Sequence, residues 1–439
     1  MATADLISPM MVAAILGSML LLLGLGIWIG LALMGVALVS MLLYSTRMPG
    51  DAMATTIFGS LTSWTLTSLP LFIWMGEILF RSKISEYMFR GLAPWMAPLP
   101  GRLMQVNVVG SAIFAAISGS SAATCATIGK MTMPELEKRG YPAEMIIGSL
   151  AGAGTLGLLI PPSIIMIVYG VAADVSINKL FIAGVIPGAL LAVLFMLYVG
   201  GWSLLNAERI PANDLRIDFA GKLRASVDLL PTALLIGAVL GSIYTGLATA
   251  TESAAIGVLG ALAISIVQGG FTWRVFAQTV SGAMKTTTMI MLILAGSSFL
   301  TIAMGFTGIP RALTDWIGHL GLSQGQLLIA LTLLFMVLGC LLDGISMVLL
   351  TTAVLLPVVT AAGFDLLWFG IYIVIVVEMA QVTPPVGFNL FVLQSLTRRD
   401  IGFVSRVAFP FFLMLLLFVV VIYLFPGIVT WLPGRMARG

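Results

Sequence analysis

Two stretches of the chain, residues 180–205 and 407–432, contain no charged side chain. Each exceeds the roughly 20 apolar residues that an α-helix needs to cross the hydrocarbon core of a bilayer. The whole chain is 60% hydrophobic and only 9% charged, whereas soluble domains carry about 25% charged residues. Because the runs also lack the period-2 alternation of barrel strands, the sequence predicts an all-α polytopic membrane protein.

Other apolar runs mark further spans. Residues 10–44 are long enough for two short spans, and the remaining runs cover 54–80, 143–173, 229–247, 249–268, 283–305 and 366–397. Residues 103–133 and 326–358 differ, because the tips SGSSAAT (118–124) and LLDGIS (341–346) interrupt them. We interpret both as re-entrant helical hairpins, since non-helical backbone at membrane depth is stable only where protein or water surrounds it.

The basic residues support this topology. With loop 81–102 in the cytoplasm, 16 of the 21 Lys and Arg residues fall on the cytoplasmic side, in agreement with the positive-inside rule. The first hairpin then opens inward and the second opens outward. The N-terminus has no basic segment typical of a cleaved signal peptide, and we expect it outside if residues 10–44 form two spans.

An internal repeat links the two hairpins. The pattern P-x5-G-[YF]-x19-P-P begins at Pro134 and again, without gaps, at Pro357, a shift of 223 residues. The same shift brings Ser120 to Asp343 and Thr155 to Glu378. Because the hairpins open to opposite sides, the repeats are predicted to be inverted, as in many secondary transporters.

A Pro-Pro pair interrupts an apolar run in each repeat. Proline lacks an N–H and clashes with the preceding turn, so helices are predicted to break at Pro161, Pro162, Pro384 and Pro385. Backbone groups freed in hydrocarbon cost several kcal/mol each unless something binds them. Half-helix ends offer carbonyls to a cation and N–H groups to an anion, so the breaks indicate binding sites. The alternative is a plain kink at each pair, with SGSSAAT as a helix-packing face.

Four acidic residues lie in or near apolar runs: Glu77, Glu252, Asp343 and Glu378. Glu77 stands four residues before Arg81, which favours an ion pair on one helix face. For Glu252, within LATATESAAIG, structural and functional interpretations remain equally open. Asp343 and Glu378 lie beside the predicted breaks, and we expect functional roles because an ionisable residue at the bilayer centre costs about 2.5–3.5 kcal/mol.

The sequence offers little for catalysis. Its one histidine, His319, is expected in a loop, and it contains neither a G-x-S-x-G motif nor a G-x4-G-K-[ST] phosphate loop. Cys125 and Cys340 have no disulfide or metal-site spacing, and a net charge of +3 is too small to indicate nucleic-acid binding. We therefore expect no enzyme and no ATP hydrolysis. A passive channel has no obvious need for two inverted hairpins.

Five segments, SGSSAATCATIG, GTLGLLIPPSIIMIVYG, ATATESAAIG, LDGISMVLLTTAVLLPV and EMAQVTPPVGFNLFV, resemble the large, DctM-like membrane subunit of TRAP (tripartite ATP-independent periplasmic) transporters of the ion-transporter superfamily. The resemblance implies an elevator-type transporter of the bacterial inner membrane. It further implies Na⁺ symport of a small organic carboxylate of the C4-dicarboxylate, sialic-acid or keto-acid class. The alternative is a stand-alone anion exchanger of the same superfamily.

The resemblance also implies partners and site residues. The partners would be a periplasmic substrate-binding protein and a small four-helix membrane subunit, expected as a separate chain because no extra span precedes residue 10. One sodium site would use Ser120, Ser121, Thr124, Gly154 and Thr155. A second would use Asp343, Gly344, Glu378, Thr383 and Pro384, and the substrate would lie near Ser121, Ser163 and Asn389.

These features predict an alternation of scaffold and transport segments. The transport domain would comprise 103–173 and 325–400, each a hairpin followed by a broken helix. The other segments would be 1–53 (N-terminal scaffold spans), 54–102 (scaffold span and arm helix of repeat 1), 174–282 (scaffold spans and connecting loops), 283–324 (scaffold span and arm helix of repeat 2) and 401–439 (C-terminal span).

Overall fold

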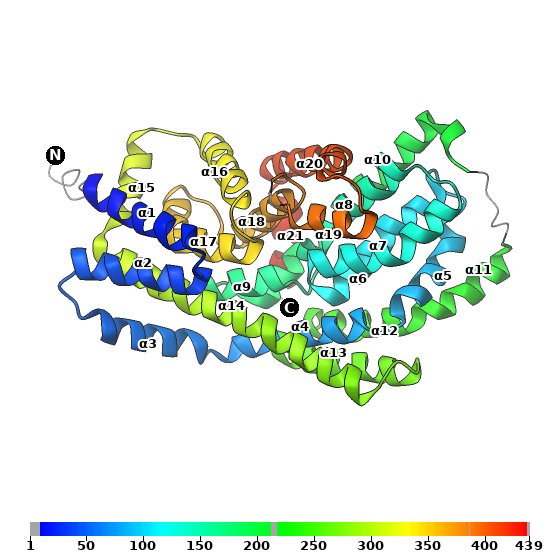
Figure 1. The fold of residues 1–439 in the computed structure, drawn as a ribbon, viewed down its shortest axis with the longest axis horizontal. Helices are drawn as coiled ribbons and strands as arrows, with labels where there is room; N and C mark the ends of the chain where they lie inside the picture. Colours follow the sequence, from blue (N-terminus) through cyan, green and yellow to red (C-terminus); the bar gives the residue numbers. More distant parts are fainter. Residues whose placement is uncertain (1–8, 212–216, 386, 437–439) are drawn as a thin grey trace.

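The computed structural model describes residues 9–211, 217–385 and 387–436 (Figure 1). Within these ranges the chain forms helices and connecting loops and no β-strand, so the predicted all-α fold is confirmed. Six of the described helices are long and apolar enough to cross a membrane, or eight if each of two bent helix pairs counts as one span. The chain is a multi-pass membrane protein.

The predicted repeat extends over almost the whole described chain. Helices α7 and α17 begin at Ser121 and Gly344, and α8 and α18 begin at Ala143 and Leu366, in both cases 223 residues apart. The first repeat contains α1 (Pro9–Gly24), α2 (Ile29–Tyr44), α3 (Pro49–Leu61), α4 (Ser68–Phe80), α5 (Ile84–Met96), α6 (Gln105–Ser118), α7 (Ser121–Lys138), α8 (Ala143–Leu159), α9 (Ile164–Ala172) and α10 (Ile177–Leu205).

The second repeat follows the same order. It contains α12 (Leu230–Tyr244), α13 (Ala250–Val267), α14 (Trp273–Thr307), α15 (Ile309–His319), α16 (Gln324–Gly339), α17 (Gly344–Ala361), α18 (Leu366–Gln381), α19 (Phe388–Thr397) and α20 (Ile401–Leu424). Helix α11 (Phe219–Ser226) lies between the repeats, and α21 (Gly427–Met436) follows them. The amphipathic stretches expected as arm helices form α5 and α15. His319 ends α15 and does not lie in a loop, which corrects the prediction for that residue.

The repeats differ in the span that follows α2 and α13. The predicted span 54–80 is bent by 57° between α3 and the short 3-10 helix Trp64–Thr67 that leads into α4. Its counterpart α14 is a continuous helix of 35 residues. It begins ten residues before the predicted span 283–305, because Thr272 caps its amphipathic first turns by accepting a hydrogen bond from the Val275 N–H at 3.2 Å.

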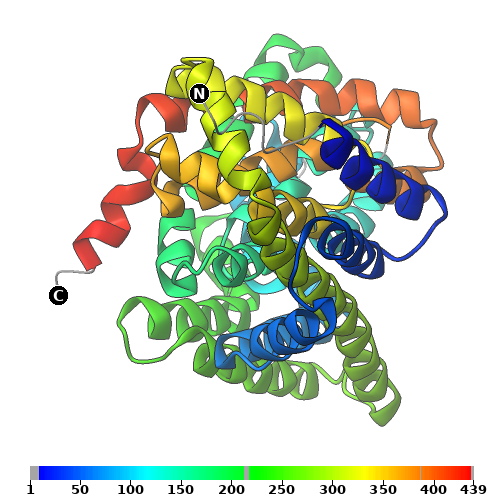
Figure 2. The same cartoon turned by 90° about the vertical axis from the view of Figure 1, so that its left-hand side faces the viewer.

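The second helix of each repeat packs against a helix of the other repeat. Helix α2 runs beside α14 in Figures 1 and 2, and α13 packs against α4. The α2–α14 contact is close because Gly30 and Gly296 face each other: a Cβ on Gly296 would lie 2.3 Å from the Gly30 carbonyl oxygen. This exchange ties the outer helices of the two halves into one framework.

The hairpins and broken helices form the centre. Helices α6 and α7 turn at Gly119, whose φ of +62° suits glycine, and α16 and α17 turn at 340–343. Helix α8 is buried from Met145 to Leu159, and α18 from Trp368 to Ala380. In each repeat the helix breaks at the Pro-Pro pair, which is cis. Helices α8 and α9 meet at 41°. The predicted hairpins and helix breaks are confirmed, whereas the division into scaffold and transport segments stays a prediction.

We expect Gly296→Ala to destabilise the protein, because the added methyl group meets backbone of α2 that no side-chain rotation can relieve. Overpacking of this kind costs about 1–3 kcal/mol. Gly305→Ala on the same helix is the matched control, since a Cβ there meets nothing within 4 Å. Thermal unfolding in detergent should show a lower Tm for Gly296→Ala alone; equal Tm values would contradict the close α2–α14 contact.

Candidate functional site

The tip of the first hairpin, residues 118–121, closes the first helix break. The Ile164 N–H at the start of α9 donates to the Gly119 carbonyl at 3.3 Å, and a Cβ on Gly119 would lie 2.8 Å from the Pro162 carbonyl oxygen. Ser163, fully buried, caps α9 by accepting from the Met166 N–H. The hairpin tip therefore supplies partners to the backbone that the prolines disrupt.

Oxygen atoms gather at the same tip. The Thr124 hydroxyl donates to the Ser120 carbonyl at 2.8 Å and lies 2.8 Å from the Ser118 hydroxyl. A Cβ on Gly157 would lie 2.5 Å from the Ser120 carbonyl oxygen and 2.7 Å from Thr124 Oγ1, so α8 approaches this cluster directly. Three neutral oxygen donors of this kind suit a hard cation such as Na⁺.

Ser121 points to the other repeat. Its hydroxyl donates to Asn389 Oδ1 at 2.9 Å, and the Asn389 amide donates to the Ala151 carbonyl at 3.5 Å. All three residues are buried. The link joins the first hairpin, the first half-helix α8 and the second half-helix α19, and it brings together two of the three predicted substrate residues, Ser121 and Asn389.

Glu378 is fully buried in α18. Among the described residues neither of its carboxylate oxygens has a well-aligned hydrogen-bond partner, while the Thr155 side chain and the Leu159 backbone lie near the carboxyl group. Leu159 ends α8, where the last carbonyls of a helix are unsatisfied and carry partial negative charge. In its ionised form, a carboxylate at this helix end would be compensated by a cation.

The tip of the second hairpin, residues 341–344, has a different character. Asp343 is exposed and caps α17, accepting from the backbone N–H groups of Ile345 and Ser346 at 3.1 and 3.3 Å and from the Ser346 hydroxyl. Gly344 packs against Val377 of α18 and Ile165 of α9. The Asp343 carboxylate thus lies at the surface of the central bundle and not within it.

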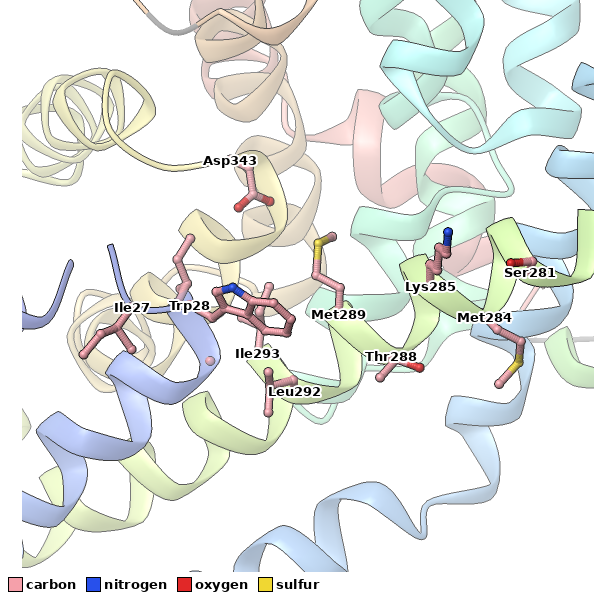
Figure 3. A pocket seen from close by; sticks show the side chains of 12 residues that line it. Ile27, Trp28, Ser281, Met284, Lys285, Thr288, Met289, Leu292, Ile293 and Asp343 are labelled. Carbon is pink, nitrogen blue, oxygen red and sulfur yellow. The ribbon is translucent and has the colours of Figure 1, made fainter. Parts of the chain in front are cut away.

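Asp343 lines a cavity of about 750 Å³ (Figure 3). The other walls are Trp28 and Gly30 at the start of α2 and a face of α14 that includes Lys285 and Met289. In Figure 3, Met289 lies between Asp343 and Lys285. The cavity therefore lies between the tip of the second hairpin and the α2–α14 pair, whereas α17 itself contacts α14 through the Ser297 hydroxyl, which donates to the Leu349 carbonyl at 2.7 Å.

The two predicted sodium sets are rearranged in space. Ser120 and Thr124 of the first set lie together, but Ser121 turns to Asn389, and a Cβ on Gly154 would lie 2.7 Å from Cys125 Cβ. Thr155, of the first set, lies beside Glu378, of the second. The Thr383 hydroxyl donates to the Met379 carbonyl at 2.6 Å, and Pro384 is exposed near Cys340.

Two other acids have structural roles. Glu77 pairs with Arg81 at 3.4 Å, which confirms the predicted ion pair. Glu252 forms a capping box with Thr249 at the start of α13, which supports the structural interpretation of this residue. Sequence reasoning gave no role to Ser118 or Lys285. Ser118 belongs to the motif SGSS and could have been found there, whereas nothing near Lys285 in the sequence indicates a cavity.

Inverted helical repeats whose hairpins and broken helices meet at the centre define a secondary membrane transporter. The family model "Tripartite ATP-independent periplasmic transporter, DctM component" matches residues 16–428. The chain therefore belongs to the DctM family, the large membrane subunits of TRAP transporters, and is a transport subunit and not an enzyme.

Curated relatives agree along most of their length. The chain is 30% identical over 384 residues to the C4-dicarboxylate TRAP transporter large permease protein of Pseudomonas aeruginosa, covering 87% of this chain and 89% of the relative. Its identity to the protein of the same name from Rhodobacter capsulatus is 30%, covering 92% and 94%. The YdaH transporter of Alcanivorax borkumensis shares the fold at a TM-score of 0.60 and 15% identity, covering 93% of this chain and 98% of that one.

We expect Glu378→Gln to abolish the rise in Tm that Na⁺ gives the wild type, because the amide keeps the size of the side chain but cannot carry the negative charge that binds the ion. Thermal unfolding in NaCl and in choline chloride measures this effect. A Na⁺-dependent rise that persists in Glu378→Gln would remove Glu378 from the ion site.

Proposed function

We propose that this chain imports a small organic carboxylate by Na⁺ symport. The observation that carries the proposal is the buried Glu378 carboxylate, without a well-aligned hydrogen-bond partner among the described residues and placed beside the negative end of α8. A cation at this point would compensate both negative groups, and the oxygen cluster of Ser118, Ser120 and Thr124 would bind another. The carboxylate would lie near Ser121, Ser163 and Asn389, where half-helix N-termini direct N–H groups at an anion.

The substrate class comes from relatives. Their names specify C4-dicarboxylates, as above, and 2,3-diketo-L-gulonate for an Escherichia coli permease that is 28% identical over 86% of this chain. An isethionate TRAP permease of Oleidesulfovibrio alaskensis matches 98% of this chain but only 67% of its own length. All three substrates are small organic anions, so an acid of this size and charge is the proposed cargo.

The proposed partners are a small membrane subunit and a periplasmic substrate-binding protein, and the proposed location is the bacterial inner membrane. The name DctMQ of the longer isethionate relative fits a large and a small subunit joined in one chain. A binding protein would deliver the acid to the outer face. Selection of the acid would then lie largely outside this chain.

The proposed mechanism is an elevator. Hairpins α6–α7 and α16–α17 and the broken helices would move as one body, because hydrogen bonds such as Ser121–Asn389 connect them. The α2–α14 framework would stay fixed. Ion binding near Glu378 would neutralise the moving body before it crosses, since a bare charge inside the membrane is costly.

Uptake should require Na⁺. Each net positive charge that moves inward gains about 2.3 kcal/mol per 100 mV, which corresponds to roughly a 40-fold concentration of substrate. The test uses proteoliposomes that contain the chain with its membrane partner, supplied with the binding protein and succinate, isethionate or 2,3-diketo-L-gulonate. Uptake that is undiminished when choline replaces Na⁺ would refute sodium coupling.

Asp343→Asn tests whether the exposed carboxylate of the second hairpin contributes to ion binding. Asn preserves size and can still cap α17, so the protein should fold, while the loss of charge should raise severalfold the Na⁺ concentration needed for half-maximal uptake. Asp365→Asn is the matched control, because Asp365 also caps a helix, α18, through the Trp368 N–H. Superimposed Na⁺ curves for all three proteins would assign Asp343 to capping alone.

A further inference from the structure

The α14 wall of the cavity in Figure 3 becomes more apolar along the helix, and Asp343 faces its apolar part from the second hairpin. Its α14 residues recur at positions 281, 284, 285, 288, 289, 292 and 293, which is a single face of the helix. Its first part has three polar residues and Met284, and its second part is wholly apolar: Ser281, Met284, Lys285 and Thr288, followed by Met289, Leu292 and Ile293. The polarity therefore changes within about two turns.

This change in polarity lies where we expect the membrane boundary. After Lys285, the segment 286–307 completes α14 without a charged residue, and 22 residues of helix extend about 33 Å, the thickness of a hydrocarbon core. Lys285 thus stands where the span begins on the cytoplasmic side, with the apolar part of the cavity directly above it.

The Lys285 ammonium group is available for a ligand. Throughout the described ranges of the chain it forms no ion pair. Glu77 of α4, whose carboxylate lies beside Gly282 on the preceding turn of α14, pairs with Arg81. The other charged residue of the cavity, Asp343, accepts hydrogen bonds from its own helix. The Lys285 ammonium group, with two hydroxyl side chains and an apolar groove beside it, therefore complements a phosphate joined to a hydrocarbon chain.

We propose that this cavity binds a phospholipid of the cytoplasmic leaflet. Lys285 holds the lipid phosphate, with Ser281 and Thr288 beside it, and an acyl chain lies along Met289 and Leu292 towards Trp28. Basic pockets between transmembrane helices on the cytoplasmic side are known to bind lipid head groups. Since Asp343 forms the opposite wall, the lipid fills the space between the α2–α14 framework and the tip of the second hairpin.

The test measures the Tm of the delipidated complex with its membrane partner. Dioleoyl phosphatidylglycerol should raise the Tm, whereas dioleoylglycerol, which lacks phosphate, and inorganic phosphate, which lacks the chains, should not. Lys285→Gln should remove most of the rise and Lys285→Arg should retain it. Lys138→Gln, an equal loss of charge at the exposed end of α7, should behave like the wild type.

Met289→Asn examines the acyl end separately. Met289 is 48% exposed, so its replacement leaves the core intact while making the groove polar, and it should also reduce the lipid-induced rise. Native mass spectrometry should find less co-purified phospholipid on Lys285→Gln than on Lys138→Gln. The proposal is overturned if the lipid raises the Tm of Lys285→Gln as much as that of the wild type. A wild-type complex whose Tm does not change with the lipid would also overturn it.

Discussion

Backbone in an apolar core must have hydrogen-bond partners, and the first Pro-Pro break of this protein is buried in such a core. The first break is stabilised by a hairpin tip: Gly119 accepts from the Ile164 N–H, and Ser163 caps the helix that restarts. The first hairpin and the first helix break therefore depend on each other. The second break is exposed at Pro384, whose carbonyl accepts from the Cys340 thiol at the second hairpin tip at 3.6 Å.

The same dependence places polar atoms at the centre of the molecule. A hairpin tip that reaches a broken helix brings its hydroxyl and carbonyl groups with it, as Ser118, Ser120 and Thr124 do. The helix end contributes partial charge, and Glu378 contributes a buried carboxyl group. A polar site inside an apolar protein is thus a consequence of the architecture, and the side chains adjust what it can bind.

Local chemistry made much of the fold predictable from the sequence. Proline dictates the helix breaks, and the 223-residue repeat appears in both the sequence and the helix starts. The start of α14 was not predictable from hydropathy, because its first turns are amphipathic and are set by the Thr272 cap. The sequence prediction grouped sodium-site residues that are close together in the chain. The structure instead pairs Ser121 with Asn389 and Thr155 with Glu378 across the repeats. Such pairings arise from tertiary packing, which no local motif encodes.

Thr155 and Glu378 are repeat equivalents that lie next to each other, so they mark the pseudo-twofold axis of the molecule. In an ancestral dimer of two identical halves, a residue at this axis would face its own copy. Two glutamates there would repel each other, and two threonines would provide no charge. A single buried carboxylate at the axis is possible only when the halves differ in sequence. Two halves that differ in sequence can therefore place a single carboxyl group at the axis, which a dimer of identical halves cannot do.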